Sequence, residues 1–312
     1  MLTLFTTAKP FRGHNAVSQR NALKSWTLLP ANVEVILFGA DDGASEVARE
    51  LGLRHEPHTK KNEFGSNRVD YLFLQAQELA RHEVLCYVNC DIILLPDFCR
   101  ALELVKSRLP RFLMVGRRWD TDITKPIDFS TYRWCEETRG RAIAANGERD
   151  EWWIDYFAFP RGLFGRDFPP LAVGRPYWDN YTVWKALDAG AAVVDASAIV
   201  TAVHQNHDYA QHPQGRAGIW RSEESRRNFE LARGWAHLRN IADATMLLQP
   251  GGLKLNPRHY WRNLHRSAAM IRNRSWFFFL GMTRPLRQKL GLRGEDLRRW
   301  RGKALPLFGK HG

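Results

Sequence analysis

Residues 84–95, VLCYVNCDIILL, are the most informative segment of the sequence for predicting the fold. Its first five residues, Val84–Val88, are apolar or aromatic without helical spacing, so they predict a buried strand. Asn89, Cys90 and Asp91 follow at once, before a second apolar run. An acid directly after a buried strand lies at the carboxyl edge of a sheet, where ligands bind. A carboxylate there can hold Mg²⁺ or Mn²⁺, or it can cap the next turn, and the tripeptide alone fits both interpretations.

The residues before Asp91 alternate between strand-like apolar runs and helix-like amphipathic segments. Strands are predicted at 2–6, 33–38 and 53–55, and helices at 14–29, 44–51 and 66–80. This β-α-β-α-β order predicts an α/β fold with a mostly parallel central sheet and helices on both faces. We therefore expect the loops after Phe5, Phe38 and Val88 to meet at one edge of the sheet.

The second half of the chain is less regular. Strands are predicted at 112–115, 152–159 and 191–195, a helix within 175–187, and a polar, loop-rich segment over 117–150. Residues 201–209 are rich in histidine and follow an apolar run.

The charge of the chain is concentrated at one end. The protein has 312 residues and a formal net charge of +13, with 44% hydrophobic and 25% charged residues, as in a globular protein. Residues 251–312 hold 15 Lys and Arg against two acids, so residues 1–250 are neutral. The sequence therefore predicts a body, 1–250, and a basic tail, 251–312. A neutral body argues against nucleic-acid binding, which needs a basic surface.

Cysteine use and hydropathy indicate a cytoplasmic protein. The four cysteines form no C-x-x-C pair and are too few for a disulfide scaffold, so we expect reduced thiols. We expect no signal peptide at the N-terminus, because no charged leader precedes an apolar run. No apolar stretch reaches the roughly 20 residues that a membrane-spanning helix needs.

Two further groups of residues are suited to catalysis or ligand binding. Residues 174–180, GRPYWDN, combine a turn with two aromatic rings, Tyr177 and Trp178, and an acid, Asp179. Sugars pack their C–H faces on aromatic rings while a carboxylate takes a hydroxyl proton, although Asp179 can also be a helix N-cap. The aromatic segment 152–160 holds a rival acid, Asp155, which either has a raised pKa or pairs with an arginine.

His204 and His207 form the second group, with Asp208 beside them. Two histidines with an acid after a strand favour a functional site over a structural one, although no third soft ligand for zinc is evident.

The order of these motifs resembles that of GT-A-type glycosyltransferases, the nucleotide-diphospho-sugar transferases of bacterial polysaccharide assembly. The resemblance covers about residues 1–210 and rests on motif order. The motifs are TLFTTAKPF (3–11), FGADDG (38–43), FGSNRVDYLFLQAQ (64–77), YVNCDIILLPDF (87–98), MVGRRWD (114–120), DYFAFP (155–160), VGRPYWDN (173–180) and VHQNHDY (203–209).

The resemblance implies a role for individual residues. Asp91 matches the metal-binding Asp of the D-x-D element, whose first Asp is replaced here by Asn89, and His204 or His207 would complete the site for Mn²⁺ or Mg²⁺. Asp179 matches the position of the general base in inverting enzymes. The positions expected to contact the nucleotide sugar are Thr6, Thr7, Asp41, Gly65, Arg68 and Asn89. For Arg68 an ion pair with Asp70 is the alternative, and for Asp41 a simple turn.

Together these features predict an enzyme that moves a sugar from a nucleotide sugar to a glycan or lipid-linked acceptor. Acceptor or sugar contacts are expected from Arg117, Tyr156, Tyr177 and Trp178, with Arg118 and Trp119 near them. A sugar-phosphate nucleotidyltransferase and a catalytically silent binding protein are the alternatives. No Gly-rich signature with a lysine opens the chain, which disfavours the nucleotidyltransferase.

The tail has the pattern of a basic amphipathic helix. Arg258, Arg262 and Arg266 recur at a spacing of four, and an aromatic run, 276–279, follows. Such a segment either lies in an anionic membrane interface or packs on the body with its arginines in solvent. The membrane interpretation predicts a peripheral protein on the inner face of the plasma membrane.

Overall fold

The computed structural model describes residues 1–206 and 215–264. They fall into two units, one comprising Met1–His259 and the other beginning at Tyr260. No helix among them is both long enough and apolar enough to cross a membrane.

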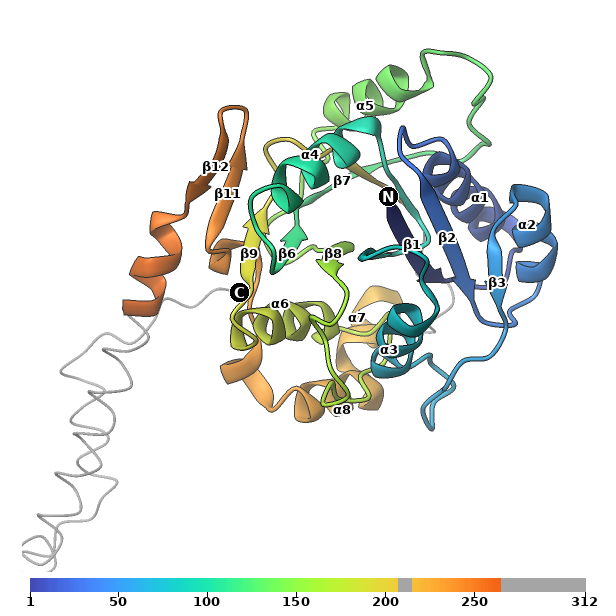
Figure 1. The fold of residues 1–312 in the computed structure, drawn as a ribbon. Coiled ribbons are helices and arrows are strands. Elements are labelled where there is room, and N and C mark those ends of the chain that lie inside the picture. The colour runs from blue at the N-terminus through green and yellow to red at the C-terminus, as the bar shows by residue number, and fades with distance from the viewer. Residues whose placement is uncertain (207–214, 265–312) are drawn as a thin grey trace, which may run out of the picture. The chain divides into compact units, whose positions relative to one another are not determined.

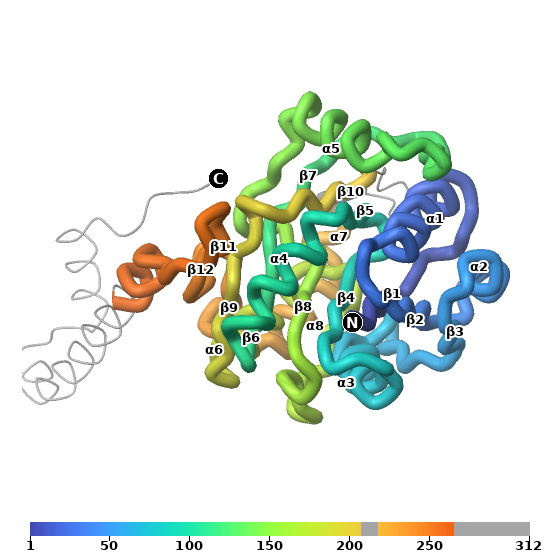
Figure 2. The backbone as a smooth tube through the Cα atoms, turned by 45° about the horizontal axis from the view of Figure 1, so that its top comes forward, coloured from blue at the N-terminus to red at the C-terminus, as the bar shows by residue number. Residues whose placement is uncertain are grey.

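The first unit is built on a large central sheet (Figures 1 and 2). The strands are β1 (Leu2–Thr7), β2 (Val33–Phe38), β3 (Arg54–Glu56), β4 (Val84–Val88), β5 (Ile92–Ile93), β6 (Phe112–Val115), β7 (Arg118–Thr121), β8 (Tyr156–Pro160), β9 (Ala192–Asp195), β10 (Ala202–Gln205), β11 (Met246–Gln249) and β12 (Gly252–Leu255). The helices are α1 (Gly13–Thr27), α2 (Ala44–Leu51), α3 (Val69–Leu79), α4 (Pro96–Lys106), α5 (Trp134–Ala144), α6 (Trp178–Asp188), α7 (Gly215–Arg221) and α8 (Glu223–Leu231), with 3-10 turns η1 (Gly234–His237) and η2 (Ile241–Asp243).

Nine strands of the described residues form the central sheet, in the order β12-β11-β9-β6-β8-β4-β1-β2-β3. Its strands are mostly parallel, as predicted, and β8 and β12 run antiparallel to their neighbours. β8 lies between β4 and β6 and so joins the two halves of the sheet. The predicted boundary after residue 250 falls in the turn between β11 and β12, and β12 belongs to the sheet.

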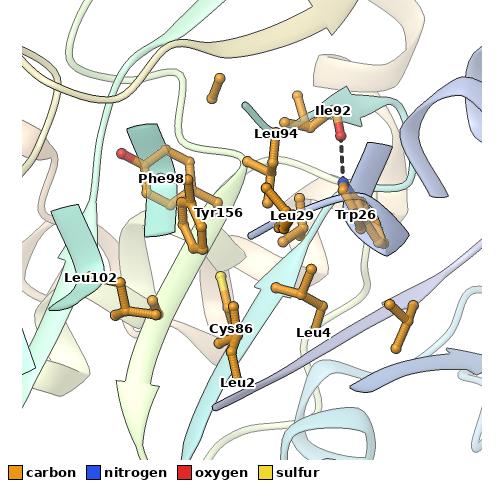
Figure 3. Packing of buried hydrophobic residues seen from close by; sticks show 14 of the residues in the cluster. Leu2, Leu4, Trp26, Leu29, Cys86, Ile92, Leu94, Phe98, Leu102 and Tyr156 are labelled. Carbon is orange, nitrogen blue, oxygen red and sulfur yellow. Dashed lines mark hydrogen bonds between the residues drawn. The ribbon is translucent and has the colours of Figure 1, made fainter. Parts of the chain in front are cut away.

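Helices cover both faces of the sheet, because strand residues alternate between two cores. One core contains residues of α1, α2 and α4 with Leu2, Leu4 and Tyr156 of the strands, and Figure 3 shows part of it. There the indole N–H of Trp26 donates to the carbonyl of Ile92 at 2.8 Å, so α1 is tied to the chain that follows Asp91. The other core contains α3 and α6, and its stacked rings of Phe73 and Phe159 lie 5.5 Å apart.

A second, three-stranded sheet was not foreseen from the sequence. It has the order β5-β10-β7, with β10 antiparallel to β5 and parallel to β7. The segment 117–150, predicted to be polar and rich in loops, also contains β7 and α5, which were not predicted. The small sheet brings Asp91, at the start of β5, next to β10 and its histidine.

Candidate active site

A cavity of about 750 Å³ lies at the carboxyl ends of the central parallel strands. Thr7 ends β1, Asp41 follows β2 and Asn89 follows β4, and all three line the cavity as the sequence predicted. The turn before α3 adds Gly65, Ser66 and Asn67. The Asn67 amide donates to the Thr7 hydroxyl at 2.6 Å, so two loops that are distant in sequence form one wall.

Thr6 and Arg68, the other predicted nucleotide contacts, do not line the cavity. Thr6 is buried, because adjacent strand residues point to opposite sides and Thr7 takes the cavity side. Arg68 donates to both carboxylate oxygens of Asp70, at 3.1 and 2.6 Å, and this ion pair raises the arginine pKa. The ion pair considered as the alternative for Arg68 is therefore the observed arrangement.

The small sheet places His204 between two acids. In the strand pairing His204 lies opposite Ile92, the residue after Asp91, and opposite Asp120 of β7. Its Nε2 lies 3.7 Å from Asp91 Oδ2 and its Nδ1 lies 3.1 Å from Asp120 Oδ1. A carboxylate on Nδ1 fixes the ring orientation and directs Nε2 toward a ligand, as in carboxylate–histidine–metal groups.

Asp120 was not predicted as a site residue, yet it connects several charged groups. Burial alone would raise its pKa, but the hydrogen bond with His204 and the cations of Arg118 and Arg149 hold it well below its usual value. Arg118 donates to Asp120 at 2.8 Å and Arg149 donates at 2.6 Å. Asp120 is therefore an ionised carboxylate at any ordinary pH.

Arg118 is buried and joins Asp120 to Asp155. Its Nη1 donates to Asp155 Oδ2 at 3.1 Å, and its guanidinium lies 4.5 Å from the ring centre of Trp153. Burial opposes the charge on Arg118, but Asp155 and Asp120 outweigh it and raise the arginine pKa. The guanidinium is thus a fixed positive charge in the wall of the cavity.

Asp155 is held on both oxygens. The amide of Asn89 donates to Oδ1 while Arg118 donates to Oδ2, and the backbone N–H of Asn89 also donates to the Asp155 carbonyl at 2.9 Å. Of the two interpretations of Asp155, the arginine pair is the one observed. The arrangement also accounts for Asn89, because its amide can donate to a carboxylate at the position where the D-x-D element has an acid.

Asp179 lies in the first turn of α6 and lines the cavity. Burial, and to a smaller extent the negative charge of Asp155, raises its pKa to about 7, against a hydrogen bond from the backbone N–H of Asn180 that lowers it. Near neutral pH such a carboxylate accepts a proton readily, which is what a general base requires.

Tyr177 precedes α6 with a φ of 85°, a left-handed conformation that is rare for a residue with a bulky side chain. The turn brings its ring into a cluster with Phe229, Trp220 and Trp235, with centroids 5.2 to 6.0 Å apart. Trp178 also lines the cavity but is only 4% exposed, since it packs against Tyr87 and Phe157. Trp178 therefore packs under the cavity wall and has little exposed ring surface on which a ligand could stack.

Tyr156 and Arg117 do not line the cavity, contrary to the expectation that they bind acceptor or sugar. Tyr156 is 0% exposed and packs edge-on against Phe98 in the core on the other side of the sheet (Figure 3). The strand alternation that points Phe157 toward α6 sends Tyr156 to the opposite face. Arg117 pairs with Glu148 at 3.2 Å. His207 lies outside the described residues.

Several residues that line the cavity had no predicted role. They are Lys9, Gln19, Lys61, Asp150, Trp152, Trp153, Arg175, Ile219, Trp220 and Trp235. Most come from loops or from the region after residue 210, where no motif resembles the family. The Lys9 within TLFTTAKPF was the one visible signal, because a cation just past a strand end faces the same edge as Thr7.

Asp91 and His204 suit a divalent cation in kind and position. An oxygen and an imidazole nitrogen 3.7 Å apart, with the imidazole held by Asp120, are a donor pair that Mn²⁺ or Mg²⁺ accepts. Within residues 1–206 and 215–264 no group of three or more His, Cys, Asp or Glu side chains is arranged to hold a metal ion. Among the described residues, Asp91 and His204 are the pair that could hold a divalent cation.

No protein-family model and no curated protein matches the chain. Solved structures do match the chain, at low sequence identity. The fragment 1–349 of S. aureus TarS in complex with UDP-GlcNAc is 10% identical with a TM-score of 0.44, over 66% of this chain and 59% of that one. Glucosyl-3-phosphoglycerate synthase of M. tuberculosis is 11% identical with a TM-score of 0.46, over 74% and 78%.

A third solved structure is the mannosyltransferase PcManGT of Pyrobaculum calidifontis, in complex with GDP-Man and Mn²⁺. It is 14% identical with a TM-score of 0.38, over 65% of this chain and 56% of that one. The chain thus spans little more than half of the TarS fragment and of PcManGT. Two of these three solved structures hold a sugar nucleotide, UDP-GlcNAc in the TarS fragment and GDP-Man in PcManGT.

Proposed function

We propose that this protein is a glycosyltransferase that moves a sugar from a nucleoside-diphosphate sugar to a hydroxyl group of a glycan or lipid-linked acceptor, with inversion at C1. The observation that carries the proposal is one cavity lined by polar strand ends, by His204 of the Asp91–His204 pair and by Asp179, whose pKa is raised to about 7. Inverting transfer needs a donor site, a means of neutralising a diphosphate and a base facing the acceptor.

The donor would lie along the wall formed by Thr7, Asp41 and Gly65, with its diphosphate toward the end of β4. Two cations of the cavity, Lys9 and Lys61, have no carboxylate within 4.0 Å among the described residues. Arg118 and Arg175 line the same cavity but are paired with acids. The two lysines are therefore the side chains with charge available for the diphosphate.

Asp91 and His204 would hold Mn²⁺ or Mg²⁺, which when bound offsets negative charge on the departing nucleoside diphosphate. Asp179 takes the proton of the acceptor hydroxyl while the oxygen of that hydroxyl attacks C1 of the donor sugar, from the face opposite the diphosphate. The C1–O bond to the acceptor forms, the C1–O bond to the diphosphate breaks, and the electron pair leaves with the phosphate. Arg118 and Asn89 keep Asp155 in place behind the reacting atoms.

A thermal-shift screen with UDP, GDP, dTDP and CMP, with and without Mn²⁺, tests this function. We expect a rise in Tm with one nucleoside diphosphate that increases when Mn²⁺ is added, because a ligand that binds only the folded state stabilises it. Lys9→Ala should reduce that rise, whereas Arg12→Ala, which removes a surface pair with Asp42, should leave it unchanged. A shift with the nucleotides but no donor turnover would favour a silent binding protein. Turnover of a nucleoside triphosphate with a sugar phosphate would favour the nucleotidyltransferase.

For the basic tail we propose peripheral attachment to an anionic membrane, on the cytoplasmic side. In its described part Tyr260, Trp261 and Leu264 are 54 to 63% exposed, as an interfacial segment requires. Co-sedimentation with phosphatidylglycerol vesicles should be lost in a chain ending at His259, the end of the first unit, and retained in the full chain. The cut lies beyond β12, so the central sheet stays complete. Equal sedimentation of both chains would contradict this proposal.

A further inference from the structure

Three tryptophans with large exposed faces lie around the cavity. Trp235 is 65% exposed, Trp220 is 48% exposed and Trp152 is 44% exposed, and all three are cavity residues. A soluble protein gains more by burying such rings than by leaving them in water, so several at one cavity indicate a ligand that covers them.

Two of the rings are held firmly around Tyr177. Trp220 and Trp235 each meet the Tyr177 ring edge-on, with centroids 6.0 Å away, and Phe229 packs against both Tyr177 and Trp235. Trp235 lies in η1, directly after Arg233 and Gly234, which both have a positive φ. The turn at these two residues brings η1 back toward α6. The backbone N–H of Arg239 then donates to the carbonyl of Asn180, and the Asn180 amide donates to the carbonyl of Arg239, each at 3.1 Å.

This aromatic group adjoins the proposed base. Asp179 lies between Trp178 and Asn180 at the start of α6, two residues after Tyr177. A molecule that presents a hydroxyl to Asp179 must therefore lie beside the ring of Tyr177 and the tryptophans packed on it. Two charged side chains, Asp150 and Arg175, line the same cavity as these rings.

We propose that Trp152, Trp220 and Trp235 form an acceptor subsite for a saccharide, which packs the C–H faces of its rings on the indoles. The inference rests on the proposed function and narrows its acceptor to a carbohydrate chain. Flat rings beside polar side chains suit a pyranose, which has apolar faces and a polar edge, because its hydroxyl groups can form hydrogen bonds with Asp150 and Arg175, whereas a prenyl chain can form none.

Calorimetric titration of the full chain with maltotriose, cellotriose, chitotriose and mannotriose, in the presence of Mn²⁺ and UDP or GDP, tests the subsite. We expect at least one trisaccharide to bind. Trp235→Ala should weaken that binding about tenfold, and Trp235→Phe should restore part of it, because an indole face at the centre of a contact contributes strongly. Nucleotide binding should be the same in all three proteins.

The matched control is Tyr132→Ala, which removes a ring that is 92% exposed and does not line the cavity. It should bind the trisaccharide as the unmodified protein does. The Tm of Trp235→Ala should stay close to that of Tyr132→Ala, so that a weaker binding is not a folding defect.

The possible outcomes test the saccharide subsite and the proposed transferase function separately. If nucleotides bind and no trisaccharide does, or if farnesyl phosphate binds and depends on Trp235, the saccharide subsite is refuted while the proposed function stands. If no nucleotide binds but a trisaccharide does, and Trp235→Ala weakens it, the subsite stands and the transferase function falls.

Discussion

The substitution Asp179→Asn allows the effect of this carboxylate on catalysis to be measured apart from its effect on the stability of the fold. The Asn side chain keeps the oxygen that accepts the N–H of Asn180 at 2.9 Å, so the start of α6 should be preserved. What the variant loses is the ability to ionise and to take a proton.

The stability effect follows from the raised pKa of Asp179, which lies at about 7 against an ordinary value of 3.8. Below pH 3.8 the carboxyl is protonated in both states and the pKa difference has no effect. Between the two values the folded state binds more protons, so its stability falls as pH rises, and above about 7 the loss is complete. At about 1.4 kcal/mol per unit of pKa, the ionised carboxylate costs the folded state about 4 kcal/mol.

Asp179→Asn removes this cost. The variant should therefore be more stable than the unmodified protein at pH 8, by up to about 4 kcal/mol, and the difference should shrink toward pH 4. Urea unfolding at pH 4, 6 and 8 measures it. Equal stability of the two proteins at pH 8 would show that the carboxylate is not desolvated enough in the folded state to raise its pKa.

Catalysis should change in the opposite direction. The unmodified enzyme should lose about tenfold in transfer rate per pH unit below 7, as Asp179 becomes protonated. Asp179→Asn should lose roughly 10²- to 10⁴-fold in transfer, with nucleotide binding retained. A variant that is more stable at pH 8 yet turns over at a near-normal rate would refute Asp179 as the base.

Two other changes probe the connection between the small sheet and the site. Asp120→Asn should weaken Mn²⁺ binding about 10- to 100-fold in calorimetry, because His204 loses the carboxylate that orients it; unchanged affinity would exclude this role. Gly147→Ala should destabilise the protein by about 1–3 kcal/mol in urea unfolding, since the added methyl group would lie 1.8 Å from the backbone oxygen of Asp120. Gly140→Ala in α5 meets nothing within 4 Å and should instead stabilise by up to about 1 kcal/mol.

The sequence predicted well those elements whose side chains all face one environment. Strands 33–38, 84–88 and 112–115 and helix 44–51 have their expected bounds, because uniform apolar runs or a regular stripe end at clear turn signals. β7 was missed because its pattern is different. Its Arg118 and Asp120 are charged but buried in ion pairs with each other and with partners distant in sequence, which no local pattern reveals.

For the site, the rule that the carboxyl ends of parallel strands meet at one edge of the sheet correctly placed single residues at or after a strand end. Thr7, Asp41 and Asn89 reach the cavity for that reason. It failed where two neighbours in a strand were given one role, as with Thr6 and Thr7, since only alternate residues share a face and Thr6 does not line the cavity. The exposed tryptophans were not predicted because Trp152 lies in a turn and Trp235 in a short 3-10 turn, and only the tertiary fold places these segments at the cavity.

The position of β8 has a consequence for how the chain is made. A ribosome delivers β1 to β4 first, and these strands can pair at once. β6 follows, but the strand that links it to β4 is β8, which ends at Pro160, so the two halves of the sheet cannot join until that residue has left the exit tunnel. Until then the free edge of β4 carries the VLCYV run, an apolar template for mispairing. The nascent chain should need chaperones most during this interval, well before its active site exists.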